Sequence, residues 1–75
     1  MIRTARLCFD SPEDRWYCQT PTQKIHLPCG TSFALRIAGQ YVGCRLEVSH
    51  DWYILTPSER FVLHPSEVYS IQIEL

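Results

Sequence analysis

The sequence predicts an all-β domain. Hydrophobic residues alternate with a period of two in several short stretches, helical spacing is almost absent, and clusters of proline, glycine and short polar residues separate the stretches. A composition of 45% hydrophobic and 20% charged residues is typical of a chain with a packed core. With 75 residues, the chain is long enough for one domain only, so we expect a single β domain over residues 1–75.

The N-terminal part predicts a hairpin. Residues 2–9 alternate as a first strand, residues 10–14 have the proline and polar composition of a turn, and residues 15–19 return as a second strand. We favour the register that pairs Phe9 with Trp16, because it buries two aromatic side chains together.

Two cysteines depend on that register. Pairing Phe9 with Trp16 places Cys8 and Cys18 on opposite faces of the hairpin, whereas a turn centred on Glu13 would place them directly opposite each other. Residues 25–30 then follow as a short extended segment that ends at Pro28 and Gly30.

The middle of the chain predicts a second hairpin. Inward positions are odd-numbered before the turn and even-numbered after it, so the loop must hold an even number of residues. A type II′ turn at Gly39 and Gln40 satisfies this condition and would pair Ile37 with Val42. Arg36, Tyr41 and Arg45 then point outward.

The next turn needs an odd loop, because the inward residues are even-numbered on both sides of it. Residues 49–51 supply three residues, so that Val48 faces Trp52 and Leu46 faces Ile54. Tyr53 and Leu55 then point outward beside Glu47 and Arg45.

The last twenty residues are less regular. Residues 56–59 start a connection, residues 61–63 are a short apolar piece, and residues 68–75 alternate again. The triplet Pro-Ser-Glu occurs at 57–59 and at 65–67, but eight residues is too short a period for a repeat architecture. Five to six short strands in a twisted meander predict a small, partly open barrel of the Src-homology-3-like or OB type.

Charge and targeting signals limit the function classes. The net charge of −1 argues against a protein whose whole surface binds phosphates, although residues 1–45 carry +3 and residues 46–75 carry −4. No signal peptide and no apolar run of membrane-spanning length are present, so we expect a cytoplasmic protein with no membrane partner.

We expect reduced thiols, no cofactor and no bound metal. The cysteines at 8, 18, 29 and 44 lack the two-residue spacing of zinc and redox motifs. The alternative is a metal site that combines His26 and Cys29 with Cys8 and Cys18. The simplest interpretation is that the cysteines are small core residues.

Residue types of catalytic sites occur, but their spacing does not favour an enzyme. Ser49, His50 and Asp51 are consecutive in a tight turn and cannot form a nucleophile relay. Cys29 with His26 nearby is a better nucleophile candidate, because a thiolate next to a histidine is reactive. A chain this short has little room for a substrate cleft, so we expect no enzymatic activity.

The outward face of the middle meander is the candidate binding surface. Arginine and tyrosine are enriched at protein interfaces, and the same residue types can stack bases and contact phosphates. We favour a protein partner over a single-stranded nucleic acid because of the net charge, and the remaining alternative is a solvated face in which Arg45 pairs with Glu47. The five residues of this surface are Arg36, Tyr41, Arg45, Tyr53 and Leu55.

The segment 39–47, followed by residues 51–55, carries a family resemblance. It resembles the pattern gly-x-trp-val-x-x-arg-ile-glu, then trp-tyr-leu, of a small all-β family of unknown function from Gram-positive bacteria and their mobile elements. Leu27-Pro28-Cys29-Gly30 and Phe33 also fit, while Tyr41 stands where the family has tryptophan.

The resemblance covers about residues 5–55 and implies a compact β domain in a bacterial, mobile-element or phage setting. It supplies no catalytic residue. Since small proteins of mobile elements often bind a host or defence protein, it implies a non-enzymatic interaction module, such as an accessory or anti-defence protein. The alternative is a small β-barrel that binds single-stranded nucleic acid.

Overall fold

The computed structural model describes all 75 residues, which form one antiparallel sheet of eight strands. No helix long and apolar enough to cross a membrane is present. The number of strands exceeds the five to six expected, because Lys24–His26 and Arg60–Val62 are strands of only three residues and are too short to show alternation. The strands are β1 (Ile2–Asp10), β2 (Arg15–Gln19), β3 (Lys24–His26), β4 (Ser32–Ile37), β5 (Gln40–Val48), β6 (Trp52–Leu55), β7 (Arg60–Val62) and β8 (Tyr69–Glu74).

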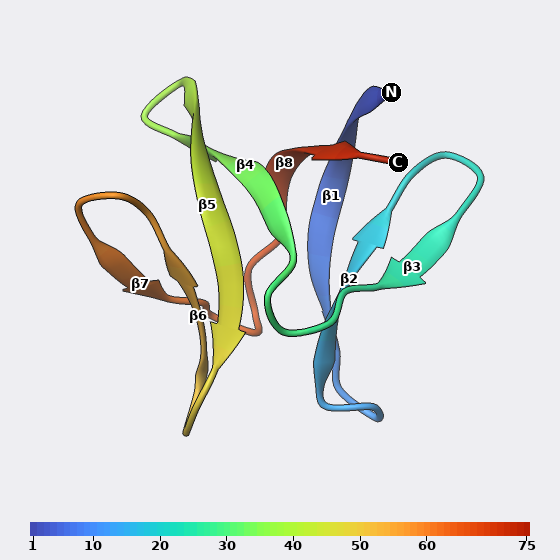
Figure 1. Cartoon of the computed structure of the whole chain (residues 1–75). Coiled ribbons are helices and arrows are strands. Elements are labelled where there is room, and N and C mark those ends of the chain that lie inside the picture. Colours follow the sequence, from blue (N-terminus) through green and yellow to red (C-terminus); the bar gives the residue numbers. More distant parts are fainter.

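The strand order is β3-β2-β1-β8-β4-β5-β6-β7. Figure 1 shows two wings, with β4 to β7 on the left and β8, β1, β2 and β3 on the right. The sheet is not closed, so the expected barrel is wrong: β3 and β7 remain as free edges. Closure would need β3 and β7 to pair with each other, and β3 pairs with β2 alone and β7 with β6 alone.

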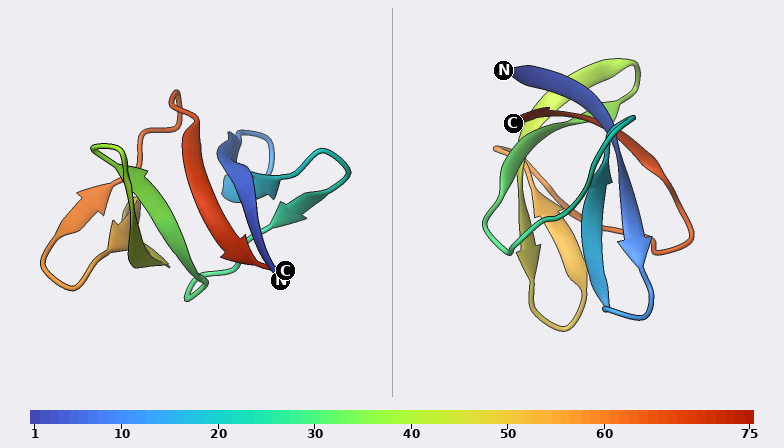
Figure 2. Two further views of the ribbon diagram at one scale, coloured as in Figure 1. Left: turned by 90° about the horizontal axis from the view of Figure 1, so that it is seen from above. Right: turned by 90° about the vertical axis from the view of Figure 1, so that its right-hand side faces the viewer.

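The topology has internal twofold symmetry. Exchanging β1 to β4 with β5 to β8 turns the strand order into its own reverse. Viewed from above, β4 and β8 lie side by side at the centre, with one meander on each side (Figure 2). Each half of the chain is therefore a four-strand repeat whose last strand pairs with the first strand of the other repeat.

The symmetry is also present in the sequence. Three matches are separated by 36 positions: Trp16-Tyr17 with Trp52-Tyr53, Thr20-Pro21 with Thr56-Pro57, and Leu27 with Leu63. Arg6-Leu7 also matches Arg45-Leu46, at a separation of 39, because the first turn of the first repeat is three residues longer. The sequence therefore contains a repeat, but its period is 36 residues and not the eight residues that separate the two Pro-Ser-Glu triplets.

Equivalent hydrogen bonds stabilise the β2–β3 turn of the first repeat and the β6–β7 turn of the second. The Thr20 amide donates to the Gln23 carbonyl at 2.9 Å, and the Thr56 amide donates to the Glu59 carbonyl at 2.9 Å. In both turns the threonine Oγ1 accepts backbone N–H groups two and three residues ahead. The Thr-Pro dipeptide thus folds the same way twice, because its hydroxyl satisfies the turn amides.

The β4–β5 hairpin differs from the expected one in its turn. The two-residue turn is Ala38-Gly39, both with positive φ (51° and 81°), so Ile37 pairs with Gln40 and Leu35 with Val42. The expected type II′ turn at Gly39-Gln40 is therefore wrong, and the strand pairing is shifted by two residues from the predicted register. Because the shift is even, the inward and outward faces are unchanged.

The other two predicted registers are confirmed. Val48 pairs with Trp52 and Leu46 with Ile54, around a three-residue loop. Phe9 pairs with Trp16, and their ring centroids are 5.3 Å apart.

The inner face of the curled sheet carries the hydrophobic core. Trp16, Leu46 and Ile54 are fully buried, while Trp52 is only half-buried at the edge of the core. Both repeats contribute through equivalent positions, such as Leu27 and Leu63 or Leu35 and Ile71. The outer face is therefore the side of the sheet that remains open to a partner.

Candidate binding surface

The five residues expected to form the binding surface lie on the outer side of β4, β5 and β6, but they divide into two groups. The upper group is Arg36 and Tyr41, which pair near the β4–β5 turn. The lower group is Arg45, Leu55 and Tyr53, farther from that turn, where Arg45 pairs with Leu55. Tyr41 and Arg45 are four residues apart on one strand, a separation of about 14 Å. Only the small pair of Ala34 and Gly43 lies between the groups.

The upper group is a cation–π pair. The Arg36 guanidinium carbon lies 5.7 Å from the centroid of the Tyr41 ring. Arg36 is exposed and has no carboxylate within ion-pair distance, so its charge is available to a partner.

The lower group combines aromatic, charged and aliphatic side chains. Arg45 Nε lies 2.9 Å from Glu47 Oε1, so the ion pair considered for a solvated face is present. Such an exposed pair contributes little to stability. Glu47 stands opposite Tyr53, and Leu55 is 37% exposed opposite Arg45. The group is thus amphipathic, with an exposed aliphatic side chain beside an internally neutralised arginine.

Strand β7 extends this surface by two residues that the sequence did not reveal. Val62 pairs with Tyr53 and is 48% exposed, and Arg60 pairs with Leu55. The Arg60 guanidinium carbon lies 3.9 Å from the centroid of the Tyr53 ring. The signal that could have found Arg60 is the repeat, because Lys24 occupies the same position in the first half.

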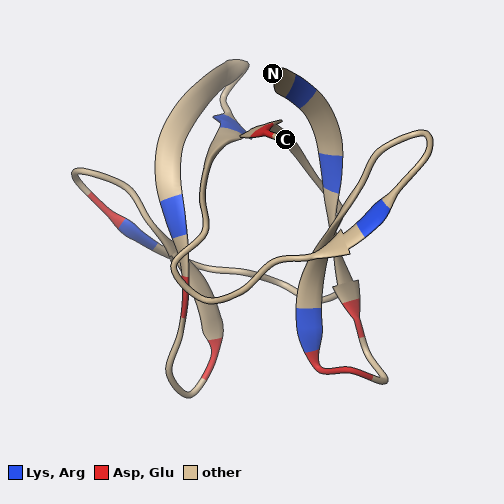
Figure 3. Cartoon of the chain, turned by 45° about the vertical axis from the view of Figure 1, so that its right-hand side comes forward, with Lys and Arg blue, Asp and Glu red and all other residues tan.

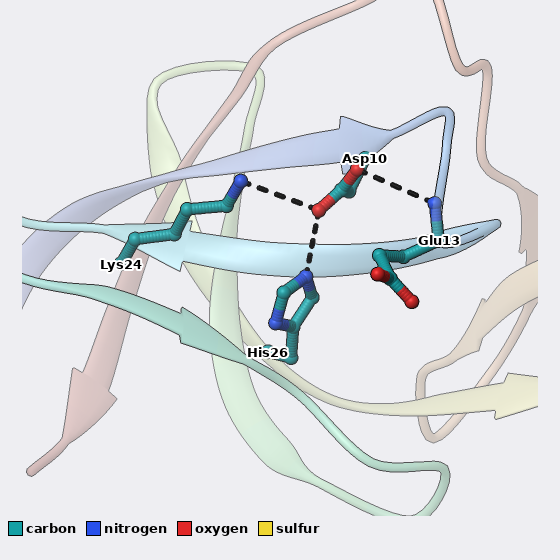
Figure 4. Close-up of polar contacts among 4 residues, drawn as sticks. All are labelled: Asp10, Glu13, Lys24 and His26. Atoms are coloured by element: carbon teal, nitrogen blue, oxygen red, sulfur yellow. Dashed lines mark hydrogen bonds and ion pairs between the residues drawn. The ribbon is translucent and has the colours of Figure 1, made fainter.

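In the first repeat the equivalent surface is polar and is fixed by Asp10. The carboxylate oxygen Oδ2 of Asp10 accepts a hydrogen bond from His26 Nε2 at 2.8 Å and lies 3.2 Å from Lys24 Nζ (Figure 4). The Glu13 amide donates to Oδ1 at 3.4 Å. The hydrogen bond from His26, followed by that from Lys24, lowers the pKa of the Asp10 carboxyl below its ordinary value of 3.8.

The two repeats keep one feature and differ in another. Lys24 Nζ lies 4.4 Å from the centroid of the Tyr17 ring, as Arg60 lies over Tyr53, so each repeat has a cation over its outer tyrosine. At the next outward position of the edge strand, two residues further on, His26 is hydrogen-bonded to Asp10, whereas the equivalent Val62 is exposed. The second repeat therefore presents the more apolar outer edge.

Acidic and basic residues are unevenly placed in the molecule. Figure 3 shows several Asp and Glu toward the turns at the lower end, others in the loop at the far left and beside the C-terminus, and Lys and Arg on the strands. The positive charges of the outer face thus coexist with a net charge of −1.

The candidate nucleophile and base do not contact each other. Cys29 Sγ lies 3.8 Å from Glu47 Oε2, while His26 is bound to Asp10. Ser49, His50 and Asp51 form an exposed turn. No group of three or more His, Cys, Asp or Glu side chains has metal-binding geometry.

All four cysteines are free. Cys18 and Cys44 are buried in the core, Cys8 is half-buried and Cys29 is exposed. Leu7 pairs with Cys18 and Cys8 with Tyr17, so Cys8 and Cys18 lie on opposite faces as expected. Burial raises the pKa of the Cys44 thiol to about 11.

The residues that match a known family cover nearly the whole fold. Residues 5–73 match the family described as Domain of unknown function (DUF5348). The chain belongs to the DUF5348 family. The match runs from β1 to β8 and therefore includes both repeats and residues 56–73, which the expected resemblance over residues 5–55 left out. No curated protein and no solved structure matches the chain.

Proposed function

We propose that this domain is a non-enzymatic protein-interaction module that binds its partner through the outer face of β4 to β7. The observation that carries the proposal is the exposure of Leu55 and Val62 beside Tyr53 and two arginines. Aromatic and arginine side chains around an aliphatic patch are the composition of protein-binding hot spots. The setting we propose is a cytoplasmic accessory or anti-defence protein of a bacterial mobile element or phage, and its mobile-element or phage origin rests on the family resemblance alone.

The alternative function is binding of single-stranded nucleic acid by the same face. Base stacking needs a free aromatic ring face, but the Arg60 guanidinium stacks on the Tyr53 ring and would have to be displaced. Arg45 is engaged by Glu47, which reduces its attraction for phosphate. Both contacts favour the protein partner.

Affinity capture from bacterial lysates, with and without nuclease, tests the proposal. We expect a partner that survives nuclease treatment and whose retention changes little between low and high salt, whereas binding to phosphates weakens steeply as salt rises. Capture that depends on nucleic acid, or no partner across several hosts, would overturn the proposal.

Variants locate the binding face. Arg45→Ala and Tyr53→Ala should each weaken binding of the captured partner by about 1 to 2 kcal/mol, since both are hot-spot residue types. Arg6→Ala is the matched control, because Arg6 occupies the position of Arg45 in the other repeat and is also exposed. Equal losses for Arg6→Ala and Arg45→Ala would show that the proposed face is not the specific one.

A further inference from the structure

We propose that the free edge of β7 binds an extended peptide segment that carries an aliphatic side chain between acidic residues. The inference deepens the proposed function and rests on it, since it names the chemical class of the protein partner. It depends on three features of the second repeat: unpaired backbone groups, an apolar groove beside them, and positive charges without carboxylate partners.

The backbone groups that remain free on β7 can be assigned. The Leu63 amide donates to the Trp52 carbonyl at 3.0 Å and the Thr56 amide to the Glu59 carbonyl at 2.9 Å, on either side of the β6–β7 pairs. Hydrogen-bonded and non-hydrogen-bonded pairs alternate in an antiparallel ladder, so Phe61 is bonded to β6 and the backbone groups of Arg60 and Val62 point away from it. They provide two N–H donors and two C=O acceptors for a ninth strand.

An apolar groove lies on the inner side of this edge. It has a volume of about 240 Å³ and is lined by Ile37, Phe61 and Leu63, with Arg36 and His64 as its polar residues. This volume is below the ~300 to 1,000 Å³ typical of small-molecule sites, so the groove suits an amino-acid side chain. A strand added to β7 would place the residue opposite Phe61 on the inner face, at this groove.

The charges around the edge select the flanking residues of the peptide. Arg36 and Arg60 have no carboxylate within ion-pair distance, and no Asp or Glu lines the groove. Residues of the added strand opposite Arg60 and Val62 would point to the outer face, beside the Arg60 guanidinium. Glutamate or aspartate at these alternate positions therefore complements the edge, whereas lysine would be repelled.

The other edge of the sheet lacks this combination. β3 has the same backbone pattern, since the Leu27 amide donates to the Trp16 carbonyl at 3.0 Å. Its outer side chains, however, are occupied by Asp10, which binds both Lys24 and His26. The repeat thus supplies an internal control for the edge of β7.

The test uses two synthetic peptides, Glu-Val-Glu-Ile-Glu-Val-Glu and Lys-Val-Lys-Ile-Lys-Val-Lys, with the intact 75-residue chain. Amide hydrogen exchange is followed by NMR. The acidic peptide should slow exchange at Arg60 and Val62 at least tenfold and leave Lys24 and His26 unchanged, while the lysine peptide should slow neither. No slowing at Arg60 and Val62 with the acidic peptide, or equal slowing by both peptides, would overturn the proposal.

Proline variants separate backbone pairing from other effects. Val62→Pro removes an N–H that the fold does not use, and proline is tolerated on edge strands, so folding should survive while peptide affinity falls at least tenfold. Val62→Ala keeps the N–H but shortens a side chain of the binding surface, so it should lower the affinity less than Val62→Pro does. His26→Pro, the same change at the equivalent position of β3, should leave affinity unchanged. Equal effects of Val62→Pro and His26→Pro would contradict pairing at β7.

Two other outcomes have defined meanings. If the chain dimerises in sedimentation experiments without peptide and Val62→Pro abolishes the dimer, a second copy occupies the edge and the peptide proposal is wrong. If a captured protein partner is lost by Tyr53→Ala but retained by Val62→Pro, the outer-face function stands and the β7 inference fails. Retention by both variants would remove both proposals.

Discussion

Leu35 and Ile71 face each other across the boundary between β4 and β8. They are 36 residues apart, which makes each the repeat equivalent of the other, and both are buried. The internal twofold axis therefore passes between these two side chains, at the centre of the core, where each repeat contributes one residue to the same cross-strand pair.

Substitution of this pair should be strongly non-additive. Leu35→Ala and Ile71→Ala should each lower the free energy of unfolding by about 2 to 5 kcal/mol, as deletions of buried aliphatic groups do. Because the residues are in direct opposition, the double variant should depart from the sum by ~0.5 to 3 kcal/mol. Urea denaturation of the four proteins measures this, and simple additivity would contradict contact across the axis.

Adjacent aromatic residues on β6 should respond oppositely to truncation. Trp52 packs against the core and its Nε1 donates to the Asp14 carbonyl at 3.2 Å, whereas Tyr53 lies on the outer face. Trp52→Ala should destabilise the fold more than Tyr53→Ala, but less than Trp16→Ala at the fully buried equivalent position, where the loss is about 3 to 5 kcal/mol. Thermal melts rank the three. A Tyr53→Ala variant that unfolds while Trp52→Ala keeps its melting temperature would refute the face assignment.

The β4–β5 turn should tolerate asparagine better than alanine. Ala38 has a φ of 51°, a conformation that asparagine adopts more readily, so Ala38→Asn should raise the free energy of unfolding by up to about 1 kcal/mol. Gly39→Ala should lower it by ~1 to 2 kcal/mol through backbone strain, since no atom lies within 4 Å of the added Cβ. Chemical denaturation of both variants checks the turn. If the turn were at Gly39-Gln40, Gly39→Ala would still destabilise the protein, but Ala38→Asn would bring no gain, because Ala38 would then lie outside the two central turn positions.

Asp10 should make stability depend on acid pH. A carboxyl whose pKa is lowered on folding contributes stability that is fully present above its ordinary value of 3.8 and is lost as the pH falls through the lower folded value. Asp10→Asn should therefore destabilise the protein at neutral pH and have little effect in strong acid. Melting temperatures from pH 7 to pH 2 measure the difference, with the exposed Asp51→Asn as control. A constant effect of Asp10→Asn over this range would argue against the His26 and Lys24 contacts.

The four thiols should react in order of exposure. In the folded protein iodoacetamide should modify Cys29 first, while Cys18 and Cys44 stay protected and the raised pKa of Cys44, about 11, slows it further. In unfolded protein without reductant, mass spectrometry should find all four modified. Fewer than four would reveal a disulfide, and rapid native labelling of Cys44 would show that it is not buried.

Alternation in the sequence predicted which side of each long strand faces the core, because a strand that buries one face has a side-chain period of two. It could not choose between registers that differ by two residues. That choice in the β4–β5 hairpin depended on Ala38 adopting a positive φ, which costs energy for a residue other than glycine. The β5–β6 register was predictable because the only polar loop of odd length was residues 49–51.

Other features depend on contacts that local patterns do not contain. Pairing of β1 with β8 joins residues far apart in the sequence, from Leu7 with Tyr69 to Ile2 with Glu74, so neither the sheet order nor the open edges could be predicted. All five predicted surface residues are on the outer side of the sheet, but Arg60 and Val62 were missed because three-residue strands show no alternation. Matching Trp16-Tyr17 with Trp52-Tyr53 would have revealed the repeat and, with it, the position of Arg60.

The exchange of last strands between the two repeats has a consequence for folding kinetics. β4 leaves the first repeat to pair with β5, and β8 returns across nearly the whole chain to pair with β1. Neither half can complete its own wing, so no half of the chain is an independent folding unit. The largest loop must close before the last wing is complete, and folding rates fall as such long-range contacts increase. This small domain should therefore fold slowly for its length, in one cooperative step.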